Sequence, residues 1–165
     1  MTTLVSSGLN PDMVVSGTKE LAAPREAVWK VISEPEEMAK LMPGVESFEI
    51  QDEKHWTAKV KVPLGLGGLK MTIKFEKLEE RPLEHASMRA KGNGVGALMD
   101  MTTAFTLTET ADNGTSMDWE ADIKIAGPVG AMGQRVLQPI VNQQIGQVLD
   151  ALEQRVTETS PTADA

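Results

Sequence analysis

The sequence predicts an α+β fold in which a curved sheet of seven antiparallel strands wraps around one long C-terminal helix. Two observations lead to this prediction. Between residues 45 and 125, apolar residues recur at every second position, which is typical of strands with one buried face. From residue 128 to 156 they recur at intervals of three and four, which is typical of one helix face. A sheet with one apolar face must cover that face, and the long helix is available to do so.

The N-terminal part is expected to hold one strand and two short helices. Alternation favours a first strand over residues 13–21. A proline stands in the first turn of each of the two helices, which are expected over residues 24–32 and 35–42. Pro43-Gly44 ends the second helix, and residues 45–51 form the next strand.

Segments rich in glycine or containing proline separate the five remaining strands. These strands are expected over residues 56–66, 69–76, 86–91, 99–107 and 117–125. Residues 65–68 permit a tight turn, and Arg81-Pro82 breaks the following strand. Residues 92–96, which contain three glycines, are interpreted as a turn or flexible loop, and Asp112-Asn113-Gly114 is a strong hairpin signal.

The last apolar stripe predicts a single helix to about Val156, with a bend at Pro139. At ~1.5 Å per residue it would span ~40 Å, the length of a whole sheet. The chain of 165 residues is expected to form one domain over residues 13–156. Residues 1–12 and 157–165 are polar and are expected to be flexible.

Composition and charge exclude several classes of function. A net charge of −8 argues against binding to nucleic acid, and against attachment to anionic lipid by charge alone. The absence of cysteine excludes disulfides and thiolate chemistry, and with two histidines no metal site is expected. Neither a secretory signal nor a membrane span is visible, so a cytoplasmic protein is the simplest expectation.

The inward face of the predicted sheet is apolar and contains no ionisable residue. Phe48, Ile50 and Leu64 are expected to face inward, and Ala58, Ala86, Ala90 and Ala121 leave room between larger side chains. An apolar cavity between sheet and helix would suit a prenyl tail, a lipid or a polyketide. The alternative is that the side chains simply fill the core. The candidate ligand-binding residues are Trp56, Met71, Ile73, Phe75, Met88, Met99, Met101, Thr103, Phe105, Met117, Trp119, Ile140, Gln144 and Val148.

Two members of this set are polar. Thr103 falls on the dry face of its strand and Gln144 on the apolar stripe of the last helix. Either could hydrogen-bond the carbonyl or headgroup of a ligand, or a backbone group or water instead.

A gate at the cavity entrance is expected from two segments, formed by Leu41, Met42, Pro43 and Gly44 and by the loop around Gly94. Ordinary turn chemistry is the alternative for both. Leu41 and Met42 would be exposed at the rim, where a membrane or a partner docks. Because the net charge is −8, docking is expected to depend on apolar contact and to change little with salt.

No catalytic residue is predicted. His55 and His85 are interpreted as solvated loop residues, and the acidic residues of the strands alternate outward. The glycine-rich segments lack the strand-to-helix context of a nucleotide-binding loop.

Several local motifs resemble one family. They are Ala22-Ala23-Pro24-Arg25-Glu26-Ala27-Val28-Trp29, Leu41-Met42-Pro43-Gly44-Val45-Glu46-Ser47, Lys91-Gly92-Asn93-Gly94 and the run from residue 127 to 133. With the order of elements, they make the chain similar to the CoxG family, named for the G subunit of carbon monoxide dehydrogenase, within the START-like (SRPBCC) superfamily and its helix-grip fold. The resemblance covers residues 13–156. It implies a carrier of an apolar ligand, such as the quinone menaquinone, with no covalently bound cofactor.

The same resemblance implies a molybdenum hydroxylase as partner, such as aerobic carbon monoxide dehydrogenase, and transient contact with the inner face of the cell membrane. Two other classes of function stay open. The first is an enzyme of the cyclase/dehydratase type, which the same fold hosts. The second is an assembly factor that binds the partner enzyme without a ligand.

Overall fold

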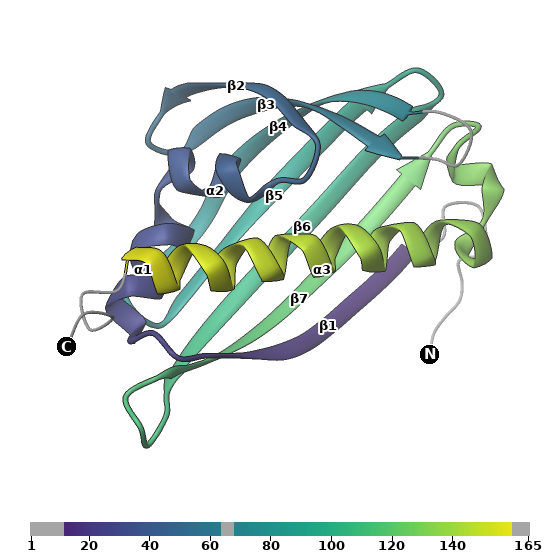
Figure 1. The fold of residues 1–165 in the computed structure, drawn as a ribbon. Helices are drawn as coiled ribbons and strands as arrows, with labels where there is room; N and C mark the ends of the chain where they lie inside the picture. The colour runs from purple at the N-terminus through teal and green to yellow at the C-terminus, as the bar shows by residue number, and fades with distance from the viewer. Residues whose placement is uncertain (1–11, 64–67, 160–165) are drawn as a thin grey trace.

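The computed structural model describes residues 12–63 and 68–159 and confirms the predicted architecture (Figure 1). The elements in order are β1 (Asp12–Leu21), α1 (Arg25–Ser33), α2 (Pro35–Leu41), β2 (Val45–Asp52), β3 (His55–Pro63), β4 (Gly68–Arg81), β5 (His85–Gly94), β6 (Ala97–Glu109), β7 (Thr115–Ala126), the 3₁₀ turn η1 (Gly130–Met132) and α3 (Gln134–Thr159). None of the described helices is long and apolar enough to cross a membrane.

The seven strands form one antiparallel sheet in the order β1-β7-β6-β5-β4-β3-β2. Every pair except β1 and β7 joins strands that follow each other in the chain, so simple hairpins build most of the sheet. Figure 1 shows the sheet curving around α3, with α1 and α2 beside the C-terminal end of that helix. The short helices therefore close one end of the space between sheet and helix.

The closed end is tightly packed. Pro24 caps α1 from just outside the helix, one residue earlier than expected, and its carbonyl accepts hydrogen bonds from the backbone N–H groups of Ala27 and Val28. One face of α1, with Val28 and Val31, is buried in the same core cluster as Leu152 and Val156 of α3. The indole of Trp56 stacks on Phe75, with 5.1 Å between the ring centroids and 6° between the planes.

Packing against the middle of α3 is looser. Val141, Ile145 and Val148 lie on the inner side of this helix, yet each keeps part of its surface accessible. Met99 and Met101 on the facing strand β6 are likewise only half-buried. Because interiors of proteins are normally close-packed, such accessibility between two layers indicates an internal space.

Three details of the fold differ from the sequence-based expectations. Phe48 and Ile50 pair with Ala58 and Trp56, so they do lie on the inner side of the sheet, but they are 37% and 41% exposed. Their strand, β2, is an edge with irregular register at both ends, so alternation there does not produce burial. Leu64 lies outside the described residues, as does most of the turn predicted over residues 65–68.

The segment of residues 92–96 is mostly strand and not loop. β5 continues to Gly94, and the turn to β6 consists of Val95 and Gly96. Gly92 is buried, and a Cβ atom there would lie 2.8 Å from the Met71 methyl carbon. This glycine therefore provides space between side chains, whereas Gly96, with a φ of 82°, provides the turn.

The C-terminal helix begins later and ends later than predicted. Gly133, with a φ of 85°, separates η1 from α3, so residues 128–133 are not part of the helix. The helix runs through Pro139 to Thr159 and so includes residues 157–159, which the sequence placed in a flexible tail. Asp12 similarly belongs to β1.

Candidate ligand-binding cavity

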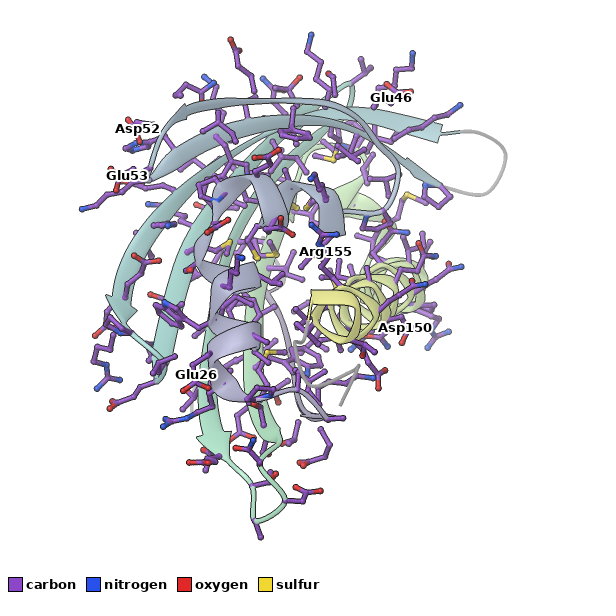
Figure 2. The ribbon with its side chains drawn as sticks, turned by 60° about the vertical axis from the view of Figure 1, so that its left-hand side comes forward. Glu26, Glu46, Asp52, Glu53, Asp150 and Arg155 are labelled. Carbon is purple, nitrogen blue, oxygen red and sulfur yellow. The ribbon has the colours of Figure 1, made fainter. Side chains whose placement is uncertain are left out.

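A cavity of about 240 Å³ lies between the concave face of the sheet and α3. Side chains from α2, from strands β3 to β7 and from α3 line it, together with Val129 before η1. None of the lining residues is ionisable. Figure 2 shows methionine sulfur atoms, in yellow, between α3 and the sheet.

The structure brings together most of the candidate residues named from the sequence. Those that line the cavity are Met71, Ile73, Phe75, Met88, Met99, Met101, Thr103, Phe105, Trp119, Ile140, Gln144 and Val148. They come from β4, β5, β6, β7 and α3, which are distant in sequence but meet because the sheet curves around the helix.

Trp56 and Met117 are not in the lining. Both face inward, as alternation predicted, but they lie in fully packed parts of the core. Trp56 lies against Phe75, and Met117 is paired with Leu107, which is also buried. Alternation identifies the buried face of a strand, but it does not tell how far along the strand the packing opens into a cavity.

Several lining residues were not among the candidates. On α3 these are Leu137, Val141, Ile145 and Leu149, which belong to the apolar stripe that predicted the helix. The stripe itself was therefore the signal for them. Met38 of α2 also lines the cavity, and nothing in the local sequence distinguishes it from an ordinary core residue of a short helix.

Two polar side chains face the cavity from different layers. Thr103 lies on β6 and Gln144 on α3. Among the described residues, neither side chain has a hydrogen-bond partner. The structure therefore does not support the alternative in which each bonds a backbone group. A hydroxyl and an amide offer both donors and acceptors to a bound molecule, and no hydrogen bond within the protein has to break for them to do so.

Methionine gives the cavity an adaptable wall. Six of the lining residues are methionines: Met38, Met42, Met71, Met88, Met99 and Met101. A methionine side chain has three rotatable bonds and a polarizable sulfur, so it can change conformation around ligands of different shape. The unusual methionine content of the sequence is thus concentrated where a variable apolar surface is useful.

The predicted gate is only partly supported by the positions of its residues. Met42 and Pro43 are half-buried and line the cavity. Leu41, by contrast, is 5% exposed and belongs to the core, so the expectation that it forms an exposed rim is wrong. Leu41 is the last residue of α2, and together with Ala39 it forms the buried side of that helix.

The two glycines of the predicted gate have structural roles. Gly44 has a φ of 72°, and a Cβ atom there would lie 2.3 Å from the carbonyl oxygen of Lys61. A Cβ atom at Gly94 would lie 2.7 Å from the carbonyl oxygen of Lys70. Both glycines therefore permit close contact between neighbouring backbones.

Exposed apolar side chains gather at the end of the cavity near the β5–β6 turn. Val95 is 92% exposed, and Leu98, Met132 and Val136 are 57%, 44% and 43% exposed. Val129 donates a hydrogen bond to the carbonyl of Gly96, which joins the segment before η1 to this turn. Since Ala97 and Val129 line the cavity, these exposed residues lie beside its end.

Neither histidine borders the cavity. His55 is exposed as expected, but it begins β3 and is not a loop residue, and its Nδ1 lies 2.9 Å from an oxygen of Asp52. His85 differs from the expectation of a solvated loop residue. It begins β5, its side chain is 17% exposed, and its Nδ1 lies 3.0 Å from the Thr106 hydroxyl.

Comparison with known sequences places the chain in a family. The sequence profile of CoxG, the G subunit of carbon monoxide dehydrogenase, matches residues 17–157, most of the chain. The chain belongs to the CoxG family. No curated protein sequence matches it significantly.

Solved structures show that this member of the CoxG family has the START-like fold. A conserved protein from Geobacillus kaustophilus superposes with a TM-score of 0.82 at 21% identity, covering 90% of this chain and 97% of that one. A START superfamily protein from Mycobacterium smegmatis gives 0.69 at 16%, covering 89% and 99%. The ZhuI aromatase/cyclase from Streptomyces sp. R1128 gives 0.68 at 15%, covering 92% and 98%. At these identities the likeness concerns the fold alone.

Proposed function

We propose that this protein is a non-enzymatic carrier that binds a quinone, such as menaquinone, or a similar lipid in the cavity. The observation that carries the proposal is the pair of unpartnered polar side chains, Thr103 and Gln144, in an otherwise apolar wall. A quinone combines an apolar ring and tail with carbonyl oxygens that accept hydrogen bonds. The Thr103 hydroxyl and the Gln144 amide can donate to such oxygens.

The size of the cavity suits the ring end of such a molecule. At about 240 Å³ it is smaller than the ~300–1,000 Å³ of typical ligand pockets. A bicyclic ring with the first part of a side chain would fill it. A long prenyl tail would then leave past Met42 and Pro43, or the lining methionines would change rotamer to enlarge the space.

The proposed partner is a membrane-linked molybdenum hydroxylase. The family name associates its members with carbon monoxide dehydrogenase, and a redox enzyme of this kind needs an electron acceptor. A protein that holds a quinone out of water could bring it between the inner face of the cell membrane and such an enzyme. A cytoplasmic location with transient contact at the membrane is part of this proposal.

An enzyme of the cyclase type is the competing proposal, because an aromatase/cyclase shares the fold. Acid–base catalysis requires a titratable group within reach of the substrate. The described residues that line the cavity include no carboxylate, histidine, lysine or arginine. This composition favours carriage over catalysis.

Quinone binding can be measured through the fluorescence of Trp119, which lines the cavity. A quinone that enters should quench this tryptophan, and 2-methyl-1,4-naphthoquinone with a short prenyl chain is a suitable probe. Substitution of Trp119 by Phe should remove most of the quenching but leave binding detectable by native mass spectrometry. Binding without any quenching in the unmodified protein would contradict the proposal, because the ligand would then lie elsewhere.

The double variant Thr103→Val, Gln144→Met tests the polar pair. Both changes keep side-chain volume and remove hydrogen-bonding groups that have no protein partner, so the fold should keep its stability. A net hydrogen bond contributes about 0.5–1.5 kcal/mol, so loss of both should weaken quinone binding by about fivefold to a hundredfold.

The matched control ligand is 2-methylnaphthalene, which has the same ring system without carbonyls. Its affinity should stay the same or rise in the double variant. An equal loss of affinity for both ligands would mean that the substitutions changed the shape of the cavity, and the role of the polar pair would be rejected.

A further inference from the structure

We infer that the outer face of the sheet, opposite the cavity, is a docking surface for a carboxylate-rich, protruding segment of a protein partner. The observation is that two pairs of lysines face each other directly across neighbouring strands. Lys61 of β3 lies directly opposite Lys70 of β4, and Lys74 of β4 lies directly opposite Lys91 of β5. Like charges directly opposite each other on antiparallel strands destabilise a sheet. The fold contains two such pairs on one face.

These lysines make no close ion pair within the described part of the chain, although Lys91 also lies opposite Asp100 of β6. Together with Lys124 of β7 they form what we call the lysine cluster: Lys61, Lys70, Lys74, Lys91 and Lys124. None of them has an ion pair within 4 Å of its ammonium nitrogen among the described side chains, which do not include that of Asp12, opposite Lys124.

Asp100 of β6 lies directly opposite both Lys91 and Lys124, but its carboxylate is already paired with Arg89. Its two oxygens accept hydrogen bonds from Arg89 at 3.0 and 2.7 Å. This bidentate contact, together with the charges of Lys91 and Lys124, holds the pKa of Asp100 below its usual value. The region therefore has an excess of positive charge even with Asp100 ionised.

Elsewhere on the outer face, several charged side chains lie beside an opposite charge or a hydroxyl group to which they are hydrogen-bonded. Glu76 lies opposite Arg89, and the Thr18 hydroxyl donates to Asp118. Glu20 accepts from Ser116, and Arg81 lies 3.6 Å from Glu79. In a chain of net charge −8, five lysines without an ion pair thus gather at one end of one face, and they include both pairs of directly opposed lysines. A local rule broken at one place and obeyed around it indicates a functional site.

The shape of this region favours a protein partner over a membrane. Lys74, Lys91 and Lys124 line a hollow of about 710 Å³ on the outer face, with Leu98 and Ala126 in its wall. The planar surface of a bilayer cannot enter a hollow, whereas a protruding loop can. Because Lys70 and Lys74 are four residues apart, the cluster extends ~13 Å along the strand, which exceeds the size of a small anion.

This inference names a chemistry for the partner in the proposed function and takes its biological meaning from that proposal. Its test uses no quinone, so the two can fail separately. The probe is a fluorescent peptide of alternating glutamate and glycine, compared with the same peptide carrying glutamine. Fluorescence anisotropy should show binding of the glutamate peptide only, and binding should weaken as salt rises from about 0.05 to about 0.3 M.

The decisive variant is Lys70→Gln, Lys74→Gln, which removes one lysine from each opposed pair. Peptide binding should fall ~fivefold, while the thermal midpoint should stay equal or rise because repulsion is relieved. The control Lys30→Gln, Lys54→Gln changes the net charge equally at exposed positions of α1 and the β2–β3 turn, and its binding should equal that of the unmodified protein.

Equal weakening in both double variants would mean that only net charge matters, and would overturn the inference. So would a lowered thermal midpoint in the first variant. Binding to phosphatidylglycerol vesicles that depends on Lys70 and Lys74, without binding of the peptide, would also overturn it and identify a membrane-facing surface instead.

Discussion

Two alanines of the sheet show how much the surroundings of a single residue decide. Ala121 on β7 lines the cavity, whereas Ala90 on β5 is fully buried in packed core outside the lining. A phenylalanine at position 121 should therefore occupy the cavity and reduce quinone uptake, with little loss of stability. At position 90 it should overpack the core and cost about 1–3 kcal/mol.

Tryptophan quenching and urea unfolding measure the two effects. Equal loss of stability in both variants, with quinone uptake unchanged in the Ala121→Phe protein, would mean that there is no usable space beside Ala121.

For single residues, the sequence could show which side chains point into the fold but not which side chains pack against them. The alternation of apolar residues correctly predicted that Met71, Met99 and Trp119 point inward, and in the structure all three line one cavity. It could not separate them from Met117, which has the same spacing but lies in tight packing. Gly92 was interpreted as part of a turn because the sequence does not reveal the methionine methyl groups that surround it.

At the scale of elements, one ion pair joins α2 to α3. Arg155 donates to both carboxylate oxygens of Glu37, at 2.6 and 2.9 Å, and Figure 2 shows Arg155 beside the short helix. The hydrogen bonds from Arg155 hold the pKa of Glu37 below its ordinary value. The same helix carries Met38, which lines the cavity, so this contact positions part of the cavity wall.

A pH dependence of stability follows from this contact. Because the pKa of Glu37 is lower in the folded than in the unfolded protein, its contribution is complete above the unfolded value of about 4.3. It is lost as the pH falls through the folded value. Replacement of Glu37 by Gln should destabilise the protein at neutral pH and flatten the fall in stability below about pH 4.3.

Urea unfolding of the unmodified and variant proteins across the acidic range measures this difference. Asp52, an exposed carboxylate whose pKa is also lowered, provides a comparison, since Asp52→Asn should leave α2 in place. Parallel pH profiles for the unmodified protein and the Glu37→Gln variant would contradict the role given to the ion pair.

The same scale shows where sequence patterns predict elements well. The prolines at the starts of α1 and α2 located these two helices to within about one residue, and the long apolar stripe located α3 except for its start, which lies at Gln134. The burial of Leu41 and the exposure of β2 were missed because both depend on what packs against the element. A seven-residue helix has too few positions for its apolar side to be identified from spacing.

At the scale of the whole molecule, the two faces of the sheet differ in chemistry. The inner face and α3 enclose an apolar cavity, and the outer face carries the lysine cluster at the end near the β5–β6 turn. The exposed Val95 and Leu98 lie at this same end. A partner bound there would lie beside the end of the cavity, so docking and ligand transfer could occur together.

The cavity also links ligand binding to the stability of the whole fold. A ligand that binds only the folded protein stabilises it by about 2.7 kcal/mol at a concentration one hundred times its dissociation constant. For a domain of this size, each kcal/mol raises the thermal midpoint by roughly 2–4 °C, so a saturating short-chain quinone should raise it by roughly 5–11 °C.

Differential scanning calorimetry with and without the quinone measures this shift. The Thr103→Val, Gln144→Met protein should need a higher quinone concentration for the same shift, because each lost hydrogen bond lowers its affinity. With 2-methylnaphthalene the unmodified and double-variant proteins should shift alike. A midpoint that quinone leaves unchanged in the unmodified protein would show that the cavity does not hold this class of ligand, and would leave the lysine cluster to be explained by partner binding alone.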